Sequence, residues 1–327
     1  MAILISALVC AVTAGLSPFA LTPILHRSGV LDVPNARSAH SLPKLRGMGL
    51  ATLLGLLIGA MAAPAREPLW LIIGASAVMA LIGFVDDVRN LPARVRLAMQ
   101  MVLGLLLGVA VVQLLGITWW VVPLIAVVFA AFVNMTNFMD GANGISALFG
   151  TVAGIAFAIV GGVTDREWLL TVGVLIGVAF LSFLPWNVLG AGMFLGDCGS
   201  YLLGSSVAVT SIVAVASGVP WPAAIAPLAI YVTDTASTIA TRMTRKERWW
   251  EAHRQHYYQQ LVDSGRSHLS VAGLLALFVA LASGAGMVAL IDMPGASLIA
   301  VVAIVAVCVM YVLAARHMVT VRRRNRS

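Results

Sequence analysis

Successive apolar segments, each close to the length that crosses a lipid bilayer, constrain this chain more than any other feature. A membrane-spanning helix needs roughly 20 apolar residues. Eleven segments approach that length, at about 2–25, 47–64, 69–85, 95–116, 118–137, 144–163, 168–186, 200–218, 222–241, 270–291 and 296–316. Because backbone polar groups in hydrocarbon must be paired within the protein, such segments are expected to be helices. The predicted fold class is all-α, a polytopic integral membrane protein with about ten to eleven transmembrane helices.

The composition excludes an ordinary soluble domain. Hydrophobic residues make up 61% of the 327 residues and charged residues only 10%. The longest polar interval, at 242–268, is too short for a separate globular unit. We therefore predict one membrane-embedded domain over 1–327, with a retained first helix. Its cytoplasmic loops are expected at 26–46, 86–95, 138–143, 187–199 and 242–269.

The distribution of basic residues predicts the orientation. All but two of the 20 Lys and Arg residues fall on one side of the predicted segments, and only Arg66 and Arg166 fall on the other. Basic loops stay in the cytoplasm. The N-terminus is thus expected outside and the C-terminus inside.

Carboxylates gather at the cytoplasmic ends of three segments. Asp86 and Asp87 end one segment, and Asp140 and Asp197 lie in glycine-rich turns that follow or precede others. Adjacent carboxylates repel, so one holds a raised pKa or both share a cation. Magnesium commonly bridges one or two carboxylates to substrate phosphates. Taken singly, each is also compatible with a solvated helix end or an ordinary turn, but together they indicate a site for a divalent metal and phosphate.

Two basic loops on the same side carry histidines. His253 and His256 are three residues apart and share a helical face, but no further cysteine or close histidine completes a zinc site. Phosphate binding or proton transfer fits this pair better, and packing of the loop is the alternative. His40 and Arg46 belong to a first loop that either lines a nucleotide-diphosphate pocket or anchors the chain by its charge. Asp234, inside an apolar segment, suits a structural hydrogen bond and a site role equally well.

These phrases, in this order, resemble the bacterial polyprenyl-phosphate N-acetylhexosamine-1-phosphate transferase family (MraY/WecA-like, glycosyltransferase family 4). The resemblance runs through 32–49, Asp86-Asp87, 134–144, 187–200 and 234–259. The first and last of these phrases look most like the branch that initiates O-antigen and related surface glycans of lipopolysaccharide.

The resemblance implies an enzyme of the inner membrane that transfers a sugar-1-phosphate from a UDP-N-acetylhexosamine-type sugar to undecaprenyl phosphate, releasing UMP. It implies Mg²⁺ or Mn²⁺ as cofactor and a site that faces the cytoplasm. By carry-over, Asp197 would be a metal ligand with Asp87 and Asp140 close to the metal, Asp86 the candidate base, and His253 with His256 the holders of the diphosphate. The substrate-binding residues would be Asn137, Asn143, Arg46, His40, Asn187 and Arg254. Many relatives carry a Lys where this chain has Gly192, so a phosphate contact from that position is not expected.

A secondary transporter is the main alternative, because it too combines many helices with intramembrane charge. Transporters place their sites near the midplane of repeated halves. Here the ionisable groups cluster at the helix ends, only Asp234 is deep, and no matching halves are visible. A membrane subunit that kept the fold and lost the chemistry would not need all four aspartates. The sequence does not fix the sugar, the glycan or the oligomeric state, and a homodimer is compatible with it.

Overall fold

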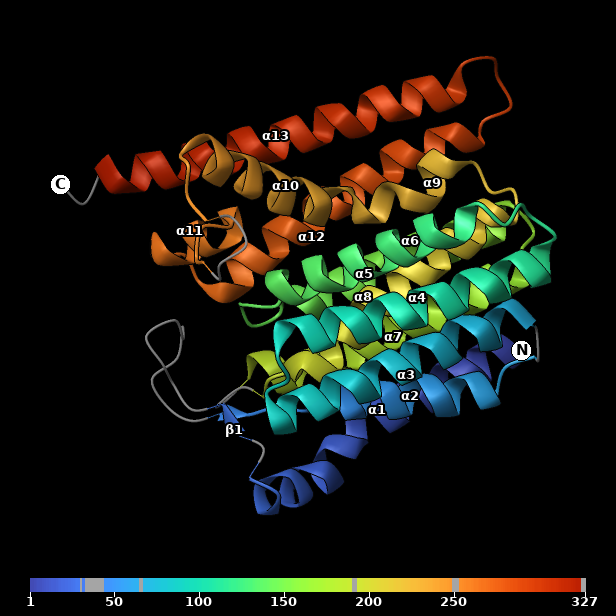
Figure 1. The fold of residues 1–327 in the computed structure, drawn as a ribbon, viewed down its shortest axis with the longest axis horizontal. Helices are drawn as coiled ribbons and strands as arrows, with labels where there is room; N and C mark the ends of the chain where they lie inside the picture. The colour runs from blue at the N-terminus through green and yellow to red at the C-terminus, as the bar shows by residue number, and fades with distance from the viewer. Residues whose placement is uncertain (30, 33–43, 65–66, 190–192, 249–252, 325–327) are drawn as a thin grey trace.

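The computed structural model describes residues 1–29, 31–32, 44–64, 67–189, 193–248 and 253–324, and it is a bundle of helices that run in broadly the same direction (Figure 1). Ten helical segments in these ranges are long and apolar enough to cross a membrane. They are α1 (Ala2–Arg27), α3 (Glu67–Arg89), α4 (Ala93–Leu115), α5 (Val121–Met139), α6 (Ile145–Val163), α7 (Glu167–Val188), α8 (Gly196–Ala216), the broken segment Trp221–Thr244, α12 (His268–Met287) with a short 3₁₀ extension, and α13 (Ala296–Arg324). The all-α polytopic prediction is confirmed.

The segment predicted at 47–64 is shorter than expected. It forms α2 (Gly49–Met61), whose 13 residues extend about 20 Å, less than the hydrocarbon core needs. The chain before it is used differently, because the Met48 and Gly49 amides donate to the carbonyls of Phe194 and Leu195. Ten long spans and this shorter helix thus account, in the described residues, for the ten to eleven helices that were predicted. The two termini lie at opposite ends of the bundle in Figure 1, as the charge distribution predicts.

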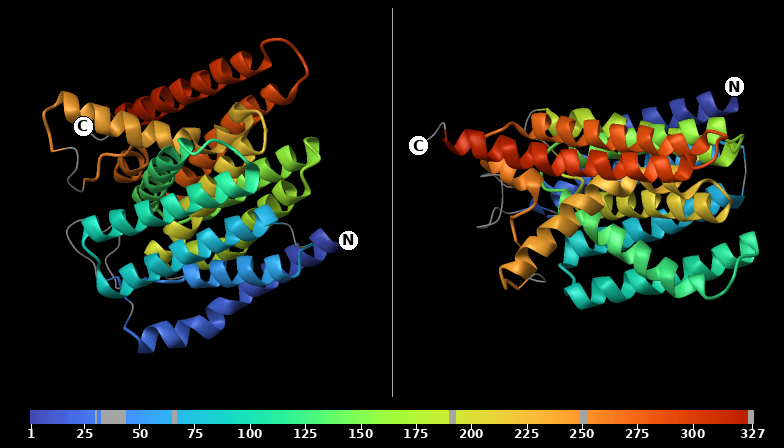
Figure 2. Two further views of the ribbon diagram at one scale, coloured as in Figure 1. Left: turned by 45° about the vertical axis from the view of Figure 1, so that its right-hand side comes forward. Right: turned by 90° about the horizontal axis from the view of Figure 1, so that it is seen from above.

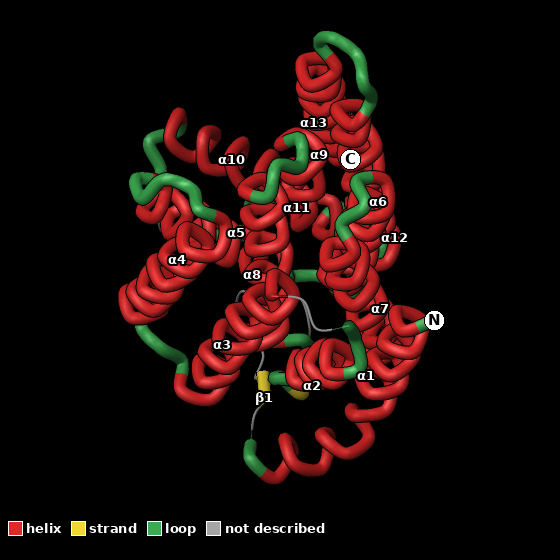
Figure 3. Tube along the Cα trace, turned by 90° about the vertical axis from the view of Figure 1, so that its right-hand side faces the viewer, coloured by secondary structure: helices red, strands yellow, loops and turns green. Residues whose placement is uncertain are grey.

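Helix α8 occupies the centre of the bundle (Figure 3). In its membrane-spanning stretch 89% of the residues are buried, whereas in those of α1 and α13 only 22% of the residues are buried. Small residues such as Gly204, Ser205 and Ser206 let α3 and α5 pack closely against it. The central helix thus brings its first turn between the last turns of α3 and α5.

The ninth predicted segment is broken. It consists of α9 (Trp221–Ile225), a 3₁₀ turn at Ala226–Leu228 and α10 (Ala229–Thr244). Pro227 lies in the turn and has no backbone N–H to continue the helix. Figure 2 shows α10 running obliquely to the rest of the bundle after this break.

Short elements cover one end of the bundle. Strands β1 (Leu31–Asp32) and β2 (Lys44–Leu45) form a two-stranded antiparallel pair, and α11 (Tyr257–Asp263) follows the loop after α10. The Phe194 amide donates to the Leu45 carbonyl at 3.0 Å, so β2 packs against the chain that enters α8. This end holds the carboxylates that the sequence singles out.

Candidate functional site

Four aspartates from three helices meet at one end of the bundle. Asp86 and Asp87 lie in the last turn of α3, Asp140 is the C-cap of α5, and Asp197 lies in the first turn of α8. Asp197 is within electrostatic range of each of the other three. The structure therefore brings together residues that are up to 111 positions apart, as the carboxylate pattern predicts.

Asp87 joins α3 to the start of α8. Its two carboxylate oxygens accept from the backbone amides of Asp197 at 2.9 Å and Cys198 at 3.0 Å. These amides are among those at a helix N-terminus that have no partner within the helix. Gly196 makes the contact possible, because its φ of +71° suits glycine and a Cβ there would collide with the Asp87 carboxylate.

Asp86 has different partners, although it is the next residue. Its carboxylate accepts from the Leu91 amide at 2.8 Å, the Arg96 guanidinium at 3.1 Å and the Tyr201 hydroxyl at 3.0 Å. The residue is only 2% exposed. The two neighbouring carboxylates are thus held in separate environments, one by α4 and α8 side chains and the other by α8 backbone.

Asp197 and Asp140 face the same region. The Asn137 amide donates to Asp197 at 2.7 Å and to Ser200 at 3.0 Å, so Asn137 orients the carboxylate of Asp197. The Ser146 hydroxyl donates to Asp140 at 2.5 Å. Burial, and to a lesser extent the charge of Asp197, raises the pKa of Asp140 to about 6. A cation near this carboxylate would offset the cost of burying its negative charge.

Arg46 is one such cation. It acts electrostatically on Asp87, Asp140 and Asp197, and it follows strand β2 directly. The end of the first basic loop therefore contributes a charge to the carboxylate cluster, a contact that the sequence analysis did not predict.

A divalent ion fits the donor set in a particular way. Among the described residues, no group of three or more His, Cys, Asp or Glu side chains is placed to hold a metal by protein ligands alone. Mg²⁺ does not require such a cage, since it is usually bound by one or two carboxylates together with substrate phosphates. The neighbouring, like-charged carboxylates of Asp87 and Asp197 match that arrangement.

Asp234 is the centre of a second buried network. Its carboxylate accepts from His256 Nδ1 at 3.0 Å, the Tyr257 amide at 3.2 Å, the Tyr258 amide at 3.4 Å and the Tyr311 hydroxyl at 2.5 Å. Asp234 is fully buried and His256 is 2% exposed. The carboxylate fixes the ring of His256 and the start of α11, which is the structural hydrogen bonding given as one alternative for Asp234.

The histidine pair lies beside the end of α5. The ring centroids of His253 and His256 are 4.9 Å apart, and His256 stacks on Phe138. The Tyr258 hydroxyl donates to the Phe138 carbonyl at 2.8 Å, two residues before Asp140. Burial, followed by the charges of His256 and Arg242, lowers the pKa of His253 to about 4, so His253 is neutral at pH 7. Its Nδ1 is buried and has no hydrogen-bond partner in the described part of the chain.

Three of the remaining predicted residues, Asn143, Asn187 and Arg254, have partners among the described residues. The backbone amide of Asn143 donates to His268 Nδ1 at 3.2 Å. The side chain of Asn187 accepts from the Gly144 backbone amide and donates to the Met193 carbonyl at 2.8 Å. Arg254 pairs with Asp263 at 3.0 Å. His40 and Gly192 lie outside the described residues.

Several participants carry no signal in the sequence. Tyr201 and Tyr311 contact Asp86 and Asp234, but each lies in an apolar helix, where tyrosine is unremarkable. Arg96 counts toward the charge bias, yet nothing in its phrase identifies Asp86 as its partner. The ten-residue spacing of Asp86 and Arg96 across the α3–α4 turn is the only available hint.

Comparison with known proteins places part of the chain beside a described family. Residues 69–215, which contain all four aspartates, match the model of glycosyl transferase family 4. This middle part of the chain is therefore similar to that family. It is 24% identical over 274 residues to the probable undecaprenyl-phosphate N-acetylglucosaminyl 1-phosphate transferase of Bacillus subtilis (strain 168), covering 76% of this chain and 75% of that protein.

Two other relatives show how broad the similarity is. The decaprenyl-phosphate N-acetylglucosaminephosphotransferase of Mycobacterium tuberculosis (strain ATCC 25618 / H37Rv) is 26% identical, over 84% of this chain and 80% of that protein. The phospho-N-acetylmuramoyl-pentapeptide-transferase of Clostridium botulinum (strain Eklund 17B / Type B) is also 26% identical, over 61% of this chain and 68% of that protein. None of these names supports a transporter.

Proposed function

We propose that this protein transfers a sugar-1-phosphate from a UDP-N-acetylhexosamine-type sugar to undecaprenyl phosphate, releasing UMP. The observation that carries the proposal is the cluster of Asp86, Asp87, Asp140 and Asp197 beside Arg46, at one end of a membrane bundle. Its relatives are named as transferases of sugar phosphates to polyprenyl phosphates. The names of the relatives support transfer to a polyprenyl phosphate, and the identities of the sugar and of the prenyl chain are our own proposal.

The reaction balances without a further reactant. An oxygen of the lipid phosphate attacks the β-phosphorus of the UDP-sugar and forms a new P–O bond. The bond between that phosphorus and the oxygen bridging to the α-phosphate breaks, and UMP leaves with the bridging oxygen. Positioning and neutralisation of charge supply most of the catalysis in such transfers.

The acidic cluster suits this requirement if Mg²⁺ or Mn²⁺ is bound with the donor. The ion would be held by Asp197 and Asp87, with Asp140 near by, and it supplies neutralisation of the phosphate charge. Arg46 adds a fixed positive charge on the same side. Asp86 stays the candidate to orient or deprotonate the lipid phosphate, since Arg96 and Tyr201 hold its carboxylate.

The histidine pair suits the donor diphosphate. His253 is neutral and partly exposed, and its Nδ1 has no hydrogen-bond partner among the described residues, so the ring can take part in a hydrogen bond to the donor. His256 is buried and its Nδ1 is engaged by Asp234. We therefore assign contact with the diphosphate first to His253, with His256 and Arg254 supporting it, and contact with the uridine to Asn143.

We place this chemistry at the cytoplasmic face of the inner membrane, because the basic loops share that face. Initiation of an O-antigen or related glycan is part of the same proposal. A monomer and a homodimer both suit it, since every residue of the acidic cluster comes from one chain.

The test is formation of a lipid-linked product. Purified protein is incubated with undecaprenyl phosphate, a divalent cation and a panel of UDP-sugars, and both UMP and lipid-linked sugar are measured. Equal amounts of the two products, absent with Asp197→Asn, are expected for at least one sugar. Absence of product with every UDP-sugar and either metal would contradict the proposal, and the active sugar identifies the donor.

A further inference from the structure

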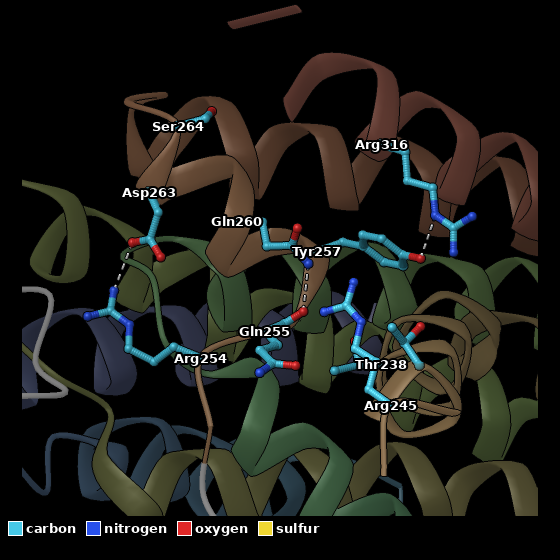
Figure 4. Close-up of a pocket in the computed structure, with 10 residues that line it drawn as sticks. Thr238, Arg245, Arg254, Gln255, Tyr257, Gln260, Asp263, Ser264 and Arg316 are labelled. Atoms are coloured by element: carbon cyan, nitrogen blue, oxygen red, sulfur yellow. Dashed lines mark hydrogen bonds and ion pairs between the residues drawn. The ribbon is translucent and has the colours of Figure 1, made fainter. Parts of the chain in front are cut away.

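A basic cavity lies apart from the carboxylate cluster, between α10, α11 and α13 (Figure 4). Its volume is about 670 Å³, enough to hold the polar part of a phospholipid or a comparable small molecule. None of the four aspartates of the cluster lines it. Of its lining residues, the proposed transfer uses only Arg254.

Three arginines from three different elements line the cavity. Arg245 is the C-cap of α10, Arg254 precedes α11, and Arg316 belongs to α13. The lining contains one carboxylate, Asp263, which pairs with Arg254 at 3.0 Å. Two positive charges therefore have no carboxylate partner within the lining.

The arginines are differently engaged. Arg316 Nε donates to the Tyr257 hydroxyl at 3.0 Å, which fixes one guanidinium at the wall while its other nitrogens stay available. The side chain of Arg245 forms no ion pair or hydrogen bond within the described part of the chain. In Figure 4 its guanidinium lies between Gln255 and Tyr257.

A second, independent feature points to a ligand. Thr238 lines the cavity, is only 4% exposed, and its hydroxyl has no hydrogen-bond partner among the described residues. Buried polar groups in proteins are nearly always paired. A lining that combines this hydroxyl-bearing residue with several guanidinium N–H groups is suited to a phosphate, which guanidinium binds through two parallel hydrogen bonds.

The position of the cavity suits a ligand at the membrane surface. The membrane-spanning segments that contain α10 and α13 end at Thr244 and Val321, so Thr241 lies in the last turn of the first and Arg316 within the last two turns of the second. We propose that this cavity binds a phosphate-bearing group. Its position near the ends of two membrane-spanning segments favours the headgroup of an anionic phospholipid as the source of that phosphate. The Tyr257 wall adjoins His256, so an occupied cavity would hold the start of α11 in place.

Binding is measured on the whole protein, in neutral detergent and without donor or acceptor. Phosphatidylglycerol, phosphatidylcholine and inorganic phosphate are added separately, and thermal unfolding is followed. Phosphatidylglycerol should raise the unfolding temperature and phosphatidylcholine should not. An equal effect of inorganic phosphate would assign the site to a soluble phosphate instead of a lipid.

Variants locate the effect. Arg245→Gln and Arg316→Gln should each weaken the apparent affinity roughly tenfold or more, because each removes hydrogen bonds between charged groups. Thr238→Val keeps the shape and all charges and should weaken it less. Arg27→Gln is the matched control, since Arg27 ends α1 on the same side and is exposed.

Two results would overturn the inference. One is equal stabilisation of the wild type by phosphatidylglycerol and phosphatidylcholine. The other is a response of Arg245→Gln, Thr238→Val and Arg316→Gln that matches that of Arg27→Gln. Because the assay needs no turnover, either result is independent of whether the proposed transfer is correct.

Discussion

Replacement of Asp234 by asparagine tests whether the buried network around it positions the histidine pair. In the wild type one carboxylate oxygen accepts from His256 and the Tyr257 amide, and the other accepts from Tyr311 and the Tyr258 amide. Asparagine keeps one acceptor and turns the other into a donor. Either orientation of the amide then points N–H groups at a donor.

The expected effect follows from these contacts. A hydrogen bond to a charged group contributes about 1.5–3 kcal/mol. If the bond to His256 is lost in the transition state, activity should fall roughly 10- to 150-fold, since about 1.4 kcal/mol corresponds to a factor of ten. The fall should appear mainly in the KM for the UDP-sugar, because the network adjoins His253 and not Asp86.

The assay is steady-state kinetics with both substrates varied, across pH, alongside thermal unfolding. Tyr311→Phe is the matched control, because it removes one donor to Asp234 and keeps the charge and the His256 contact. A purely structural role predicts that both variants lose stability and keep wild-type kinetics. If folded Asp234→Asn shows wild-type kcat and KM at every pH, the assignment of Asp234 as a positioning residue is wrong.

Four further predictions concern the site and the topology. Asp197→Asn should abolish activity while the protein still inserts, and full activity of the wild type in excess chelator would contradict a metal role. Asp87→Asn should lower thermal stability more than Asp86→Asn, because the Asp87 carboxylate accepts hydrogen bonds from two backbone amides of α8. Asp86→Asn should chiefly lower turnover, by roughly 10²–10⁴-fold if Asp86 is a base. Identical defects of the two variants in every parameter would refute this distinction. In the unfolded chain His253 takes up a proton near pH 6.5, whereas in the folded protein its pKa is about 4. Its contribution to the free energy of unfolding is therefore present above pH 6.5 and is lost as the pH falls through 4. The stability of His253→Asn, measured by thermal unfolding at each pH, should depend less on acid between these two pH values. A cysteine at Ser28 should resist a membrane-impermeant reagent in intact cells, whereas one in the turn between α4 and α5 should react, and labelling of the first would reverse the topology.

Much of the site could be predicted because the membrane restricts where charge can lie. A carboxylate in an apolar helix is costly unless it is near an end or has a partner, so Asp86, Asp87, Asp140 and Asp197 were expected at one face. That expectation needs only helix length and the distribution of Lys and Arg. The span predicted at 47–64 is shorter because Met48 and Gly49 are bonded to the segment before α8, a contact between residues about 146 apart.

The sequence by itself determined the all-α membrane architecture, the number of long helices to within one, and the face on which the acidic residues gather. These properties follow from local hydrophobicity and from charge, which act on each segment separately. Only the tertiary structure decided that Asp87 caps α8, that Asp86 pairs with Arg96 and Tyr201, and that Asp234 holds His256. Inside the bundle water is scarce, so each buried carboxylate must find donors on the protein, and packing alone decides which distant residues provide them.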